Sequence, residues 1–227
     1  MQSFIRKKAL VPLIPLLAGF SICLLIIVLF AENSFAALKA LFVQTFTSKY
    51  YFGSMLNKSV FLITAGLGQC IALKSGNMNL GGEGQVYFGG YIAALVLTSA
   101  FPLPSFLLLL LSLILTLLSG AALTIPAAYL KEKRGAQVLL TSFLISAATL
   151  PLVDGLITKS KSKGNENLLA LPYIDSVFRW KQLLPPSPLN ISFFLVLVFS
   201  FLMYCFLFKS KRGKKLSIWG ISAEFAK

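Results

Sequence analysis

The sequence predicts an all-α, polytopic membrane protein with about six transmembrane helices. Of its 227 residues, 57% are hydrophobic, a share that soluble domains rarely reach. These residues gather in long runs, and basic residues stand in short segments between the runs, as in membrane-protein loops. A polar, glycine-rich stretch at 74–85 interrupts the pattern and predicts a broken or re-entrant element.

The charge and the residues that are missing exclude several classes of function. A net charge of +14 could indicate nucleic acid, but the basic residues follow the loop pattern of a membrane protein, so we expect no nucleic-acid partner. There is no His, and Cys23, Cys70 and Cys205 stand far apart in apolar runs, which argues against a metal or disulfide framework. With so few acids, a membrane-embedded enzyme is disfavoured too. No phosphate-binding loop is present, so any ATP must bind another subunit.

The amino-terminal part has two readings. Basic residues at 6–8 precede an uncharged run at 9–31, a pattern shared by signal peptides and first membrane spans. The run is longer than a typical signal-peptide core, so we favour an uncleaved span. Residues 32–58 are mixed, and they predict either a short interfacial helix or an external loop.

Three further spans are expected at 105–129, 138–157 and 191–208. The first contains Gly120-Ala-Ala122, which predicts a face for close helix packing. The second is interrupted by Pro151 and Asp154. The long polar region 158–190 predicts a loop, with short structure at most.

The basic residues predict that both termini lie on the cytoplasmic side of the membrane. Two compact basic clusters, a loop at 131–134 and a segment at 209–215, then fall on the inner side. A third cluster at 159–163 falls outside and argues the other way. The larger share of basic residues still lies inside.

The glycine-rich stretch lies between two short apolar pieces, 60–73 and 86–101, each shorter than a full span. Its glycines allow positive φ or close backbone approach. Glu83 is the only acid between positions 32 and 132, and a carboxylate beside membrane spans needs a partner or a function. We expect it beside the start of a helix that begins near Gln85, with Lys74 as a candidate partner. A solvated turn is the alternative.

Residues 79–85, with the sequence NLGGEGQ, follow a Gly-Leu-Gly at 66–68 and precede Gly-Gly at 89–90. They resemble the N-I-G-x-E-G-Q signature of permease subunits of bacterial ABC importers, in the branch for simple sugars and nucleosides. The resemblance implies transport of a nucleoside, a simple sugar or a related small polar solute such as riboflavin. It also implies that the substrate pathway or broken helix includes Asn79, Gly81, Gly82, Glu83, Gly84 and Gln85.

Two other segments resemble the same family less closely. Around 131–142 the family pattern K-x-x-x-G-x-x-E-V-I-x-T is met by Gly135 and Thr141, but Val138 replaces an acid and Ser146 a frequent Asn. The tail resembles L-R-A-V-G-x-N-P-E-A-A-R, which implies that the cytoplasmic segment 209–227 contains a coupling helix that docks on an ATPase. The implied coupling residues are Gly220, Ser222, Ala223, Glu224 and Ala226. A basic tail held by anionic lipid is the alternative.

The resemblance implies a single permease domain over 1–227 that pairs with a second permease subunit, a cytoplasmic ATPase subunit and an extracytoplasmic substrate-binding protein or lipoprotein. The resemblance also implies that the lipid bilayer around it is the bacterial cytoplasmic (inner) membrane. No cofactor is expected on this chain, because ATP binds the partner subunit. Family members usually have further carboxy-terminal spans, so we expect a split, truncated or degenerate subunit. The alternative functions are an energy-independent channel, a structural membrane subunit or a truncated, non-functional permease.

Overall fold

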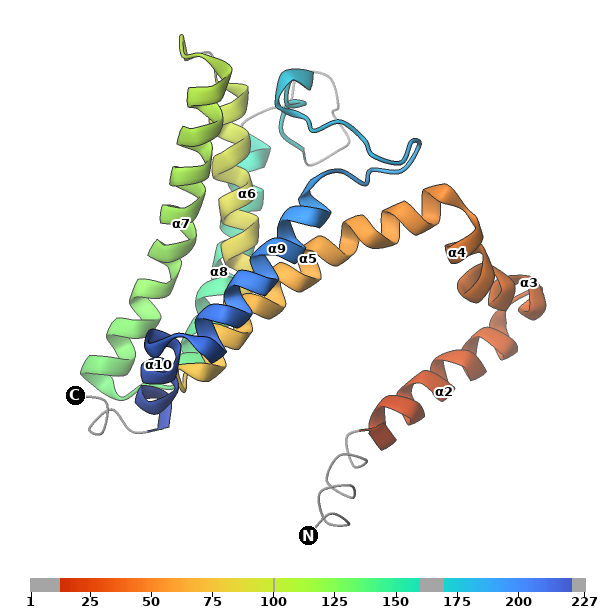
Figure 1. The fold of residues 1–227 in the computed structure, drawn as a ribbon, viewed down its shortest axis with the longest axis horizontal. Helices are drawn as coiled ribbons and strands as arrows, with labels where there is room; N and C mark the ends of the chain where they lie inside the picture. Colours follow the sequence, from red (N-terminus) through yellow and green to blue (C-terminus); the bar gives the residue numbers. More distant parts are fainter. Residues whose placement is uncertain (1–12, 100, 160–169, 222–227) are drawn as a thin grey trace. The chain divides into compact units, whose positions relative to one another are not determined.

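The computed structural model describes residues 13–99, 101–159 and 170–221, and these contain helices and no strand. The all-α prediction is therefore confirmed (Figure 1). In chain order the elements are α2 (Leu13–Phe30), α3 (Ser34–Lys39), the π-helical turn η1 (Ala40–Gln44), α4 (Thr45–Thr47), α5 (Lys49–Lys74), α6 (Gly82–Thr98), α7 (Ser105–Arg134), α8 (Val138–Lys159), the 3-10 turn η2 (Ser176–Phe178), α9 (Ser192–Tyr204), the π-helical turn η3 (Cys205–Lys209) and α10 (Lys211–Ile221).

Four helical stretches in the described part of the chain are long and apolar enough to cross a membrane. They are α5, α7, α8 and the continuous stretch of α9 and η3. The first predicted span is the shorter apolar helix α2, and α6 has 17 residues. The protein is thus polytopic, and each of the predicted apolar segments is helical.

The helix before the break is longer than expected. The region 32–58 was predicted as an interfacial helix or a loop, and its first part does form the short elements α3, η1 and α4. Its last part belongs to α5, which begins at Lys49 and has 26 residues. The apolar run at 60–73 is therefore the second half of a long helix. Only the piece after the break is short.

The chain divides into two compact units. The first comprises residues 1–58 and 182–190. Within it, the fully buried Ser187 lies against Gly53 of α5, where an added Cβ would come 2.6 Å from the Ser187 Cβ. The Ser187 hydroxyl donates to the carbonyl of Leu184 at 2.6 Å, and this bond satisfies the buried hydroxyl.

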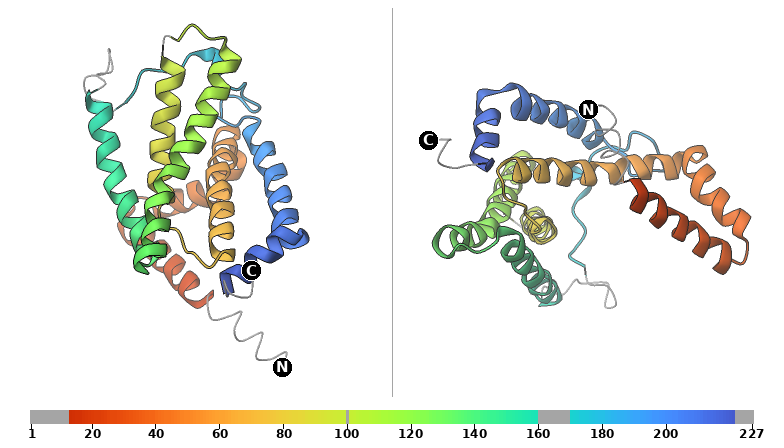
Figure 2. Two further views of the ribbon diagram at one scale, coloured as in Figure 1. Left: turned by 90° about the vertical axis from the view of Figure 1, so that its left-hand side faces the viewer. Right: turned by 90° about the horizontal axis from the view of Figure 1, so that it is seen from below.

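The second unit, residues 59–181 and 191–227, is built on α6, α7 and α8. These helices are neighbours in each view (Figures 1 and 2). Gly89 of α6 faces Thr116 of α7, where an added Cβ would lie 3.0 Å from the threonine methyl. The Thr116 hydroxyl donates to the Gly89 carbonyl at 3.3 Å. A small residue here allows close approach of the two helices, as is usual in membranes.

Within the described part of this chain, nothing packs on the predicted face at 120–122. An added Cβ at Gly120 would meet nothing within 4 Å, and Ala121 and Ala122 are exposed. Instead the buried side chains of α7 include Ser112 and Ala127. Small size permits close packing but does not by itself select which face of a helix packs.

Two further local predictions need correction. The basic cluster at 131–134 is the last turn of α7 rather than a loop, and Gly135 ends the helix with φ 65°. Basic side chains suit that position because they compensate the carbonyl end of the helix dipole. Helix α8 also continues through Pro151 and Asp154 without interruption.

Candidate functional site: the glycine-rich break and its pocket

The predicted break is present. Helix α5 ends at Lys74 and α6 begins at Gly82, three residues before the expected start. Gly76 has φ 71°, a conformation that favours glycine. The Asn79 side chain accepts a hydrogen bond from the Gly81 N–H at 2.8 Å, forming a local turn that leads into α6.

Two buried serines of α8 cap the start of α6. The Leu80 N–H donates to the Ser142 hydroxyl at 3.0 Å, and the Gly84 N–H donates to the Ser146 hydroxyl at 2.8 Å. The Gly84 N–H is one of the first N–H groups of α6, which have no partner in the helix itself, so Ser146 satisfies a group that would otherwise be unpaired. Leu80 lies just before the helix, and Ser142 holds the chain that leads into it. Sequence reasoning missed Ser142 and noted Ser146 only as a departure from a family pattern.

The motif glycines differ in what requires them. An added Cβ at Gly84 would lie 2.8 Å from the Cα of Ser146, so the close approach of α8 requires glycine there. At Gly81 it would lie 3.2 Å from the Ser142 carbonyl oxygen. At Gly82 it would meet nothing within 4 Å, so packing does not explain that glycine.

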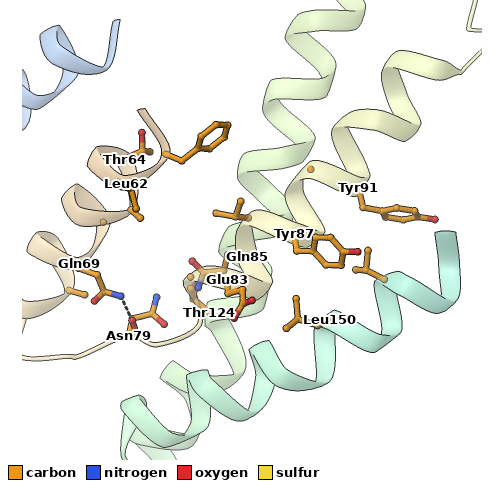
Figure 3. Close-up of a pocket in the computed structure, with 18 of the residues that line it drawn as sticks. Leu62, Thr64, Gln69, Asn79, Glu83, Gln85, Tyr87, Tyr91, Thr124 and Leu150 are labelled. Atoms are coloured by element: carbon orange, nitrogen blue, oxygen red, sulfur yellow. Dashed lines mark hydrogen bonds between the residues drawn. The ribbon is translucent and has the colours of Figure 1, made fainter. Parts of the chain in front are cut away.

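Besides the serines of α8, side chains of α5 and α7 bind the loop between α5 and α6. The Gln69 amide of α5 donates to the Asn79 carbonyl (Figure 3). The Lys131 ammonium of α7 donates to the Asn77 side chain. Hydrogen bonds thus connect the loop to α5, α7 and α8.

A pocket of about 1610 Å³ lies beside the break, lined mainly by α5, α6 and α8. Its volume exceeds the roughly 300–1,000 Å³ of ordinary small-molecule sites. Four predicted motif residues line it, namely Asn79, Gly82, Glu83 and Gln85. The other two, Gly81 and Gly84, are buried and do not line it.

Glu83 lies in the first turn of α6 and lines the pocket (Figure 3). The free N–H groups and the dipole at a helix start stabilise a negative charge there. The expected partner Lys74 lies instead with its ammonium 4.3 Å from the centre of the Phe208 ring. The helix terminus is therefore the feature that accommodates this carboxylate.

Tyr87 and Asp154 form a second polar feature of the pocket that sequence reasoning missed. The Tyr87 hydroxyl donates to Asp154 Oδ1 at 2.5 Å, joining α6 to α8. Glu83 and Tyr87 are four residues apart and so share one face of α6. That spacing was the one available signal, since Asp154 lies 67 residues away.

Of the predicted coupling residues, the structure describes Gly220 alone. The others, at 222–226, lie outside the described residues. Gly220 is the penultimate residue of α10 and packs against the backbone of the break. An added Cβ there would lie 2.7 Å from the Gly76 nitrogen. The structure therefore places Gly220 of the tail against residues 74–76, at the start of the break.

Comparison with known proteins identifies the family of the chain. The family described as branched-chain amino acid transport system / permease component matches residues 51–227. The chain belongs to this family. Its members are permease components of transport systems and are not enzymes, so the family predicted from the NLGGEGQ motif is confirmed.

Several relatives are permeases of named transporters. The chain is 29% identical to the probable riboflavin import permease protein of Treponema pallidum, over 97% of this chain and 59% of the relative. It is 24% identical to the guanosine ABC transporter permease protein of Bacillus subtilis, over 94% of this chain and 62% of the relative. It is 28% identical to a glucose ABC transporter permease protein of Haloferax volcanii, over 69% of this chain and 41% of the relative. The chain thus spans less than two thirds of the length of these relatives. No solved structure matches it.

Proposed function

We propose that this chain is the transmembrane permease subunit of an ATP-driven importer for a nucleoside, a simple sugar or a related small polar solute such as riboflavin. The family and the named activities of the relatives support this proposal. The observation that carries it is the large pocket whose wall includes the polar end of a broken helix. Broken helices line solute paths because their free backbone groups and end dipoles face the solute.

The pocket has the composition that a small polar solute requires. Apolar side chains of α5 and α8 form much of its lining, while Gln69, Asn79, Gln85 and Glu83 place polar groups at the end next to the break. Such a mixture gives a solute apolar contact area together with a few directional hydrogen bonds. The break therefore offers a polar binding surface at one end of the pocket.

The contact between Gly220 and Gly76 supports a coupling role for the tail. No side chain separates the two backbones, so a displacement of α10 would be passed directly to the loop before α6. In this proposal the segment 220–226 docks on a cytoplasmic ATPase, and closure of the ATPase pair moves the break. The second permease subunit and an extracytoplasmic binding protein complete the assembly.

Orientation is part of the proposal. Both termini face the cytoplasm, because the basic last turn of α7 and the basic helix α10 resist translocation. The break and the end of α7, joined by the bond from Lys131 to Asn77, would then lie on the cytoplasmic side.

The test is solute uptake into membrane vesicles that contain the complete importer assembly. We expect labelled guanosine, riboflavin or glucose to accumulate only when ATP and this chain are both present. The control is the same assembly with its ATPase inactivated. Equal uptake without ATP would indicate an energy-independent channel, and no ATP-dependent uptake of any of the three solutes would contradict the proposal.

A further inference from the structure

Tyr87 and Asp154 connect two walls of the pocket, since Tyr87 belongs to α6 and Asp154 to α8 and both line the cavity. Their hydrogen bond of 2.5 Å fixes Oδ1 of a half-buried carboxylate. A carboxylate has a second oxygen, Oδ2, that can accept further hydrogen bonds. Because an acid between membrane helices is costly, it is expected to face a partner or a solute.

Other residues on the same face of α6 as Tyr87 also line the pocket. Glu83, Tyr87 and Tyr91 follow one another at four-residue spacing, and all three line the cavity (Figure 3). The tyrosine rings offer flat surfaces for a ring-shaped solute, and Glu83 offers a second hydrogen-bond acceptor. Leu150 of α8 adds apolar surface to the same lining.

The charge of the pocket is opposite to that of the chain. The net charge of the protein is +14, yet within the described lining the charged residues are Glu83 and Asp154, with no Lys or Arg. Two negative charges on the cavity wall repel an anion and attract hydrogen-bond donors. The pocket therefore disfavours a phosphate group.

We propose that Asp154, oriented by the Tyr87 hydroxyl, is a specificity-determining acceptor for the transported solute. It accepts a hydrogen bond from an N–H or O–H group of an unphosphorylated ring solute, which packs against the tyrosine face of α6. Phosphorylated forms of the same solute are rejected. This inference rests on the proposed function and names the residues that select the solute.

Binding to the 227-residue chain in lipid nanodiscs tests this inference without the ATPase or the binding protein. The probes are guanosine and guanosine monophosphate, which share their ring donors and differ in the phosphate. Saturation-transfer difference NMR reports weak binding directly. We expect guanosine signals at least about tenfold stronger than those of the monophosphate, the ratio that about 1.4 kcal/mol of discrimination gives.

Two variants separate recognition from a purely structural tie between α6 and α8. Asp154→Asn keeps the shape and can still accept the Tyr87 hydrogen bond, so a structural tie would survive it. We expect Asp154→Asn to weaken guanosine binding about tenfold. The difference between guanosine binding and guanosine monophosphate binding should then become smaller. Tyr87→Phe keeps the ring but frees the carboxylate to rotate, so it should weaken guanosine binding less. If both act through one contact, the double variant should lose no more than the larger single effect.

The matched controls are Glu132→Gln and Tyr129→Phe on α7, neither of which lines the pocket. Both should bind like the unmodified chain. Equal binding of the two probes, unchanged guanosine binding by Asp154→Asn, or no guanosine binding by the unmodified chain would overturn the inference. If Asp154→Asn fails to fold, two measurements still test the inference. They are the ratio of guanosine to guanosine monophosphate signals for the unmodified chain and the guanosine binding of Tyr87→Phe. Loss of ATP-driven uptake with this binding pattern intact would count against the proposed function alone.

Discussion

Gly220 of α10 packs backbone to backbone against Gly76, the residue with positive φ that follows α5. A Cβ added at Gly76 would lie 3.0 Å from the Gly220 Cα, and one added at Gly220 would lie 2.7 Å from the Gly76 nitrogen. Neither position has room for a side chain. The contact therefore joins α10 to the loop between α5 and α6, which leads into the polar part of the pocket lining.

The first prediction concerns this contact. Gly220→Ala should push α10 away from the loop, because backbone cannot yield as a flexible side chain can, at a cost of about 1–3 kcal/mol. We expect ATP-driven uptake to fall about tenfold while guanosine binding to the chain persists. Gly66→Ala is the control, since a Cβ at Gly66 would meet nothing within 4 Å. Normal uptake by Gly220→Ala would show that the contact transmits nothing.

The second prediction concerns the cap that α8 provides for α6. Ser146→Ala leaves the Gly84 N–H without its acceptor, which should lower stability by about 1–3 kcal/mol. Gly84→Ala should lower stability more than Ser146→Ala, because the added Cβ would lie 2.8 Å from the Ser146 Cα. Thermal unfolding of the detergent-purified protein measures both.

A comparison serine lies on α9. Among the residues that the structure describes, the Ser200 hydroxyl bonds its own helix alone, through the Val196 carbonyl, so Ser200→Ala should change stability little. Equal melting temperatures for Ser146→Ala and Ser200→Ala would contradict the capping role.

Features that depend on local sequence could be predicted. Alternating apolar runs and basic segments gave the all-α membrane class, and the glycines of 79–85 gave the break and the position of Glu83 at a helix start. These features follow from hydropathy and backbone freedom, which neighbouring residues determine.

Features that depend on tertiary register could not be predicted. The caps from Ser142 and Ser146 and the bond between Tyr87 and Asp154 join residues more than 60 positions apart. A serine in an apolar helix gives no sign of which backbone N–H it will meet. The buried positions Ser112 and Ala127 of α7 were missed for the same reason, because residue size alone does not show which positions meet a neighbouring helix.

The third prediction concerns sidedness. Single cysteines at position 181 in the carboxy-terminal part of the long loop and at position 211 at the start of α10 should differ in access, after Cys23, Cys70 and Cys205 are replaced. In intact cells an impermeant reagent should label position 181 and spare position 211, since the basic helix α10 stays inside. Labelling of position 211 without position 181 would reverse the topology.

The fourth prediction concerns the tail as a docking segment. Deleting residues 220–227 should release a co-purifying ATPase while membrane insertion stays normal. Affinity purification followed by an ATPase assay measures this release. An ATPase that stays bound after the deletion would favour a basic tail held by anionic lipid instead.

The central claim is that the break beside the pocket is a working part of the transport path, and Glu83→Gln tests it most directly. The substitution keeps the shape and removes the charge at the start of α6. In the complete assembly, uptake and membrane abundance should be measured on the same vesicles. We predict that uptake falls about tenfold or more at unchanged abundance, in line with the loss of a contact to a charged group. Loss of both membrane abundance and uptake would indicate that Glu83 has a structural role in holding the break. Uptake and abundance equal to those of the unmodified protein would contradict the account.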